Sequence, residues 1–138
     1  MTLECIDVRL RAAISKVVHA DIRQLNGFME SITPVDCITG ILAFNMACDS
    51  PDDFKNLMIE QASLLKPGGT FLTAIVCNSS CFKVNGETIH YPRISFPWIL
   101  ECLNNAGFNN VAYSIFPARP NISGETRSYL FVSAKLLE

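Results

Sequence analysis

Residues 36–44 read Asp-Cys-Ile-Thr-Gly-Ile-Leu-Ala-Phe, and residues 70–77 read Thr-Phe-Leu-Thr-Ala-Ile-Val-Cys. Both stretches are almost continuously apolar and lack the alternation of a strand with one wet face. Such strands are typical of parallel sheets, which are covered on both faces. A helix is predicted between them over residues 51–65, because Ser50 can cap it and Pro51 suits its first position. This strand–helix–strand order predicts an α/β fold.

The segments on either side extend this unit. Apolar residues from Leu3 to Val17 recur at spacings of three and four and predict an amphipathic helix. A short strand rich in β-branched residues is expected next over residues 17–20, and Asp21 stands at its end. Toward the carboxyl end, an Asn-Gly pair predicts a tight hairpin within residues 81–92. A helix over 96–106 and strands over 111–116 and 128–136 complete the set, and the last two strands are expected to be antiparallel because their connection is short.

Length and composition restrict the classes of protein that fit. The 138 residues predict one domain over 1–138, and 49% hydrophobic against 17% charged residues excludes a disordered chain. No apolar run reaches the roughly 18–20 residues of a membrane span, and no signal peptide is visible, so we expect a cytoplasmic protein without a membrane partner. A net charge of −2 without a basic cluster argues against a nucleic-acid partner. The six cysteines form no CxxC pair, which favours reduced core thiols over disulfides and predicts no metal site.

Two motifs support a more specific interpretation. Residues 64–72 (Leu-Leu-Lys-Pro-Gly-Gly-Thr-Phe-Leu) resemble the turn and fifth strand of class I S-adenosylmethionine-dependent methyltransferases, whose sheet is Rossmann-like. Residues 103–108 (Leu-Asn-Asn-Ala-Gly-Phe) resemble the end of the next helix in the same proteins. Segments 10–13, 19–22, 36–38 and 47–52 narrow the resemblance to the family that contains nicotinamide, phenylethanolamine and indolethylamine N-methyltransferases.

The resemblance covers nearly the whole chain but only the carboxyl-terminal part of that family's fold, lacking its first two strands. It implies S-adenosylmethionine as cofactor and a small amine or aromatic nitrogen heterocycle as methyl acceptor. The family's glycine-rich turn and ribose-binding acid have no counterpart here, since none of the seven glycines forms a G-x-G motif. The strand over 36–44 would therefore keep an open edge, through which another chain could pair.

The resemblance also implies three cofactor-binding residues. Asp21 would accept a hydrogen bond from the adenine amino group, while Ile22 would donate its backbone N–H and pack on the ring. Ile41 matches a position that touches the adenine end of the cofactor. The structural alternatives are a turn-capping Asp21 and a purely core Ile41.

On the substrate side, the resemblance implies contacts from Ser79 and from Tyr91 in the hairpin region. Ile75 departs from the nicotinamide-type pattern, in which a carboxylate holds the substrate amide, so nicotinamide is a poor expectation. No catalytic base can be identified.

Three functional hypotheses follow. The first is an N-methyltransferase-like chain, in which catalysis depends on holding nucleophile, methyl and sulfur in line. The second is a catalytically inactive, shortened paralogue that pairs with a full-length methyltransferase. The third is a generic nucleotide-binding module.

Overall fold

A four-stranded mixed sheet forms the centre of the computed structural model, which describes residues 3–24, 34–120 and 124–137. The strand order is β1 (Val35–Ile41), β2 (Leu65–Cys77), β6 (Ser128–Leu136) and β5 (Phe108–Pro117). β1 and β2 are parallel, whereas β6 runs antiparallel to both β2 and β5. The predicted α/β class, the pairing of the two apolar strands and the antiparallel closing pair are all confirmed.

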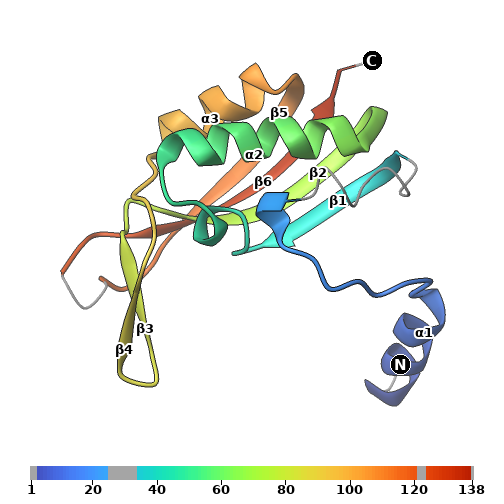
Figure 1. Ribbon diagram of the computed structural model, residues 1–138, viewed down its shortest axis with the longest axis horizontal. Coiled ribbons are helices and arrows are strands. Elements are labelled where there is room, and N and C mark those ends of the chain that lie inside the picture. Colours follow the sequence, from blue (N-terminus) through green and yellow to red (C-terminus); the bar gives the residue numbers. More distant parts are fainter. Residues whose placement is uncertain (1–2, 25–33, 121–123, 138) are drawn as a thin grey trace.

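Two helices cover one face of this sheet, α2 (Pro51–Leu64) and α3 (Phe96–Asn105) (Figure 1). The Ser50 hydroxyl caps α2 by accepting from the backbone N–H of Asp53 at 3.1 Å, as the sequence predicted. The indole N–H of Trp98 donates to the carbonyl of Pro51 at 3.1 Å and joins the amino ends of the two helices.

Phe71 lies at the centre of the core between the helices and the sheet. Its ring is fully buried, with its centroid 5.3 Å from that of Phe44 and 5.1 Å from that of Phe108. These three rings connect the end of β1, the middle of β2 and the start of β5. They therefore couple the packing of three strands under one helical layer.

The opposite face of the sheet has no helix packed on it within the described residues (Figure 1). We call it the open face. It presents the exposed apolar side chains of Ile41, Leu72, Phe116 and Phe131, of which Phe116 and Phe131 stack edge to face at 5.5 Å. Side chains alternate between the faces along each strand, so these four point away from the core that holds Phe71.

The hairpin pairs β3 (Cys81–Val84) with β4 (Glu87–His90) just beyond the carboxyl end of β2. Asn85 and Gly86 have φ values of 51° and 86°. Two consecutive positive φ values define the tight turn that the Asn-Gly pair predicted.

The amino-terminal prediction is partly wrong. α1 (Leu3–Ala13) is helical as expected, but no strand forms over 17–20, and the chain runs without regular structure to a 3-10 turn, η1 (Ile22–Gln24). A strand requires a neighbour for its backbone hydrogen bonds, and within the described residues this segment has none. Nor is any helix in the described ranges long and apolar enough to cross a membrane.

Three strand boundaries also differ from prediction by three residues or more. β1 ends at Ile41 rather than at residue 44, because Leu42 adopts a φ of 56° and turns the chain so that Phe44 enters the core. β2 begins at Leu65 because that residue already pairs with Val35. β5 likewise begins three residues earlier than predicted, at Phe108.

No disulfide links the six cysteines, all of which lie in the described residues, and four of them are buried. Burial raises the pKa of Cys48 to about 12, with a further contribution from the carboxylates of Asp53 and Asp49. Burial likewise raises the pKa values of Cys77 and Cys102 to about 11.

Replacing Phe71 with Ala should lower the free energy of unfolding by about 3–5 kcal/mol, because a fully buried aromatic ring is lost and leaves a cavity. Denaturant titration measures this change. Phe116→Ala on the open face is the control and should cost less than about 1.5 kcal/mol. Equal losses for the two variants would contradict the central role of Phe71.

The raised thiol pKa values predict a loss of stability in alkali. Below pH 9 the thiols are neutral in both states, whereas between pH 9 and about 12 the unfolded thiol of Cys48 ionises first. The free energy of unfolding should then fall by at most about 1.4 kcal/mol per pH unit for this group. Cys48→Ala should reduce that slope, and an unchanged slope in this variant would contradict the role of Cys48. Denaturant titrations between pH 8 and about 11 decide between these outcomes.

Candidate functional site

The carboxyl ends of β1 and β2 form the edge at which open α/β sheets bind ligands. The Thr73 hydroxyl donates to the carbonyl of Gly40 at 2.7 Å, and the Leu42 N–H donates to the carbonyl of Ala74 at 2.8 Å. The Phe44 ring packs directly against Gly40, where a side chain would have no room. The loop after β1 is therefore held firmly against the end of β2.

This loop contains a polar side chain that the sequence analysis missed. Asn45 is fully buried, and both its side-chain amide oxygen and its amide nitrogen lack a hydrogen-bond partner. An unsatisfied buried amide costs free energy and calls for an explanation. A single amide within the apolar run 41–47 was the signal that could have identified it.

Asp21 lies at the start of η1 and is paired with Arg23. One carboxylate oxygen accepts from the Arg23 backbone N–H at 2.9 Å and from its Nε at 3.1 Å, and the other accepts from a terminal guanidinium nitrogen at 2.8 Å. The side-chain and backbone hydrogen bonds from Arg23 lower the pKa of Asp21 to about 2. This is the geometry of the turn-capping alternative. A carboxylate has about four acceptor positions, so one remains for a ligand.

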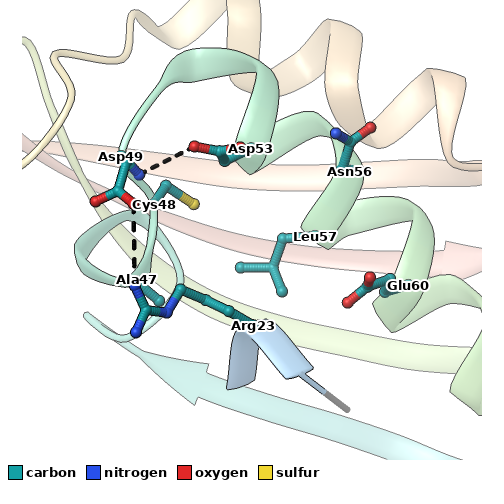
Figure 2. A pocket seen from close by; sticks show the side chains of 8 residues that line it. All are labelled: Arg23, Ala47, Cys48, Asp49, Asp53, Asn56, Leu57 and Glu60. Carbon is teal, nitrogen blue, oxygen red and sulfur yellow. Dashed lines mark hydrogen bonds and ion pairs between the residues drawn. The ribbon is translucent and has the colours of Figure 1, made fainter. Parts of the chain in front are cut away.

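Arg23 also borders a groove of about 260 Å³ between η1 and α2 (Figure 2). Its guanidinium lies 3.9 Å from the carboxylate of Asp49, whose backbone N–H donates to the Asp53 carboxylate at 3.1 Å. Glu60 adds a third carboxylate to the lining. One cation against three carboxylates makes the groove acidic.

The other two predicted cofactor residues lie apart from this groove. Ile22 is half-buried and packs against the core, whereas Ile41 is 63% exposed and lines a hollow of about 370 Å³ on the open face. Neither Asp21 nor Ile22 lines that hollow. The described residues do not bring Asp21, Ile22 and Ile41 together into one cavity.

Ser79 and Tyr91, the predicted substrate contacts, are brought together. The Tyr91 hydroxyl donates a hydrogen bond to the Ser79 hydroxyl oxygen at 3.1 Å. The Ser79 hydroxyl in turn donates to the backbone carbonyl of Cys81 at 3.3 Å. Both side chains are buried, and burial raises the pKa of Tyr91. In this arrangement they fasten the hairpin to the end of β2.

Ile75 is fully buried in the core beneath the helices. An aliphatic side chain there supplies packing and no hydrogen bond. Among the residues that the structure describes, no group of three or more metal-ligating side chains converges.

Comparison with known proteins identifies the class. The structure of Burkholderia thailandensis 1,6-didemethyltoxoflavin-N1-methyltransferase with bound 1,6-didemethyltoxoflavin and S-adenosylhomocysteine matches with a TM-score of 0.63 at 15% identity, over 100% of this chain and 58% of that one. Haemonchus contortus phosphoethanolamine N-methyltransferase 2 in complex with S-adenosyl-L-methionine gives 0.55 at 12% identity, over 75% and 33%. The fold is thus the Rossmann-like fold of S-adenosylmethionine-dependent methyltransferases.

The family follows from the sequence match. The model of the NNMT/PNMT/TEMT family matches residues 2–136, and the chain therefore belongs to that family. Indolethylamine N-methyltransferase of Oryctolagus cuniculus is 28% identical over 102 residues, which are 73% of this chain. The match spans only 39% of the length of that relative.

The unsatisfied amide of Asn45 leads to a prediction about stability. Asn45→Leu replaces it with an apolar side chain of similar size and should raise the free energy of unfolding by about 1–2 kcal/mol. Asn104→Leu, at an exposed position on α3, is the control and should change stability by less than about 0.5 kcal/mol. Denaturant titration compares the two, and a destabilised Asn45→Leu variant would show that the amide has a partner in solution.

Proposed function

We propose that the chain provides the carboxyl-terminal part of an S-adenosylmethionine-dependent N-methyltransferase that acts on a small nitrogen compound. The match of the family model over residues 2–136 carries this proposal. Six cysteines without a disulfide in the described residues favour a reducing, cytoplasmic setting. The domain proposed is a single partial methyltransferase domain over residues 1–138.

Two features of the structure fit the cofactor. The carboxylate of Asp21 retains acceptor capacity beyond its bonds to Arg23, which suits an adenine amino group. The buried amide of Asn45 at the carboxyl end of β1 has unmet donors and an unmet acceptor, which suits a polar ligand at this edge. When bound, the cofactor supplies an electrophilic methyl group on a sulfonium.

The residues of this chain would act by binding and orientation. Asp21 and the backbone N–H of Ile22 would hold the adenine, and Ile41 would contact its apolar surface. Ser79 and Tyr91 would fix the hairpin beside the methyl acceptor. Holding the reactants in line can lower a barrier by several kcal/mol, about 7–11 in well-oriented systems.

The polar groups at this edge favour one kind of acceptor. Asn45 is neutral and cannot remove a proton, and Ile75 offers no carboxylate for an ammonium group. A protonated alkylamine must first lose a proton, whereas a pyridine-type nitrogen is nucleophilic as it stands. An aromatic nitrogen heterocycle is therefore the acceptor we propose to test first.

The test uses a fusion protein in which this chain is extended at its amino end by the corresponding part of a longer relative. The amino-terminal part of Mus musculus indolethylamine N-methyltransferase is joined to residues 2–136, and S-adenosylhomocysteine binding is measured by calorimetry. Asp21→Ala should weaken binding by about 1–3 kcal/mol, because the adenine amino group loses its acceptor. The 138-residue chain alone should show no measurable radiolabelled methyl transfer to pyridines or arylalkylamines.

Asp7→Ala is the matched control, since Asp7 is another exposed carboxylate paired with an arginine, Arg11, at 2.9 Å. It should leave binding unchanged. Equal affinities for Asp21→Ala and the parent would return Asp21 to its turn-capping role. Turnover by the 138-residue chain alone would show that the remaining part of the fold is not needed.

Within the described residues β1 pairs only with β2, and its open edge favours a second candidate function, that of a non-catalytic partner of a full-length methyltransferase. An unpaired strand edge can accept a strand from another chain. Co-purification of the chain with a full-length homologue, without cofactor binding by the chain itself, would support this role over the first.

A further inference from the structure

Two apolar surfaces in this chain lack a packing partner in the structure. One is the open face, with Ile41, Leu72, Phe116 and Phe131 exposed by 63%, 37%, 54% and 45%. The other is the stripe of Leu3, Ile6 and Leu10 along α1, exposed by 84%, 46% and 59%. No residue of α1 is buried. We propose that α1 docks with this stripe on the open face of its own sheet and supplies the missing second helical layer.

The helix itself needs such a contact. α1 has 11 residues, and an isolated helix shorter than about 12–15 residues is marginal in water. Most of the stability of short protein helices comes from packing an amphipathic face. Leu3, Ile6 and Leu10 follow one another at the three- and four-residue spacing of such a face.

The sheet has one face that no helix covers within the described residues. Parallel sheets are ordinarily covered by helices on both faces, and β1 and β2 form a parallel pair. α2 and α3 cover only one face here, and α1 extends from the other side of the sheet (Figure 1). The open-face hollow of about 370 Å³ is lined by side chains from all four strands, which gives an apolar helix stripe a concave place to dock.

The connection between the two surfaces is long enough. Ile22 packs against the core and anchors the chain, while residues 14–21 form no helix or strand. Eight extended residues span at most about 26 Å. The four strands are about 14 Å across at about 4.8 Å per neighbour, so this span exceeds the width of the sheet.

The test measures how strongly α1 shields the open face. Ser133 is exposed on β6, opposite Leu72, and Ser133→Cys places a thiol in the middle of the face. Cys5→Ser and Cys37→Ser remove the two exposed native thiols and leave four buried ones. The alkylation rate of this parent by iodoacetamide is compared with that of two α1 variants.

Leu10→Asp disrupts the stripe and should raise the alkylation rate about tenfold, the ratio expected from a docking preference of about 1.4 kcal/mol. Val8→Asp is the matched control, because Val8 is an exposed apolar residue on the opposite side of the same helix. It should change the rate by less than about twofold. Equal rates in all three proteins, or equal effects of the two substitutions, would overturn the proposal.

Two further measurements separate the alternatives. Protection that fades on about 100-fold dilution would assign the covering helix to a second copy and overturn docking within one chain. Amide hydrogen exchange should show α1 protected in the parent and unprotected in the Leu10→Asp variant. Unprotected α1 amides in the parent would refute docking, and unchanged Trp98 fluorescence confirms that the core is intact in every variant. The inference does not rest on the proposed methyl transfer, but a docked α1 and the adenine would compete for contact with Ile41.

Discussion

The packing of Phe71 between Phe44 and Phe108 is the contact on which the rest of the structure depends. It fixes β2 as the strand that pairs with β1 on one side and β6 on the other. Because interiors are close-packed, the three rings also set where α2 and α3 can lie. The turn at Leu42, which brings Phe44 into the core, follows from the same requirement.

That core also positions the candidate site. The Phe44 ring packs against Gly40. Because Asn45 follows Phe44 directly, it is fully buried just beyond the carboxyl end of β1. The unmet amide there lowers the stability of the chain. Local violations of packing rules of this kind are expected at functional sites. The Ser79–Tyr91 bond places the hairpin beside the same edge.

The one-sided distribution of helices explains the remaining features. α2 and α3 cover the core face of the sheet, whereas Leu72 and Phe131 on the open face are exposed. Within the described residues no strand pairs with the outer edge of β1. The segment before η1 likewise pairs with no strand there. The matched relative from Oryctolagus cuniculus is longer than this chain, since the match spans 39% of its length.

The sequence by itself determined the elements whose signals are local. The apolar runs predicted β1 and β2, Ser50 and Pro51 predicted the start of α2, and Asn85-Gly86 predicted the hairpin turn. The motifs at residues 64–72 and 103–108 indicated a methyltransferase, and segments 10–13, 19–22, 36–38 and 47–52 indicated the family. Membership of the family is confirmed over residues 2–136. Each of these signals acts within a few residues and needs no distant partner.

Only the tertiary structure decided the features that depend on distant contacts. The strand expected before Asp21 does not form because no strand among the described residues pairs with it. The Asn45 side-chain amide has no hydrogen-bond partner because the surrounding residues bury it. Ser79 and Tyr91 form a hydrogen bond because the hairpin folds back on the end of β2. Propensity acts along the chain, whereas pairing, burial and hydrogen-bond satisfaction are settled by segments that meet only after folding.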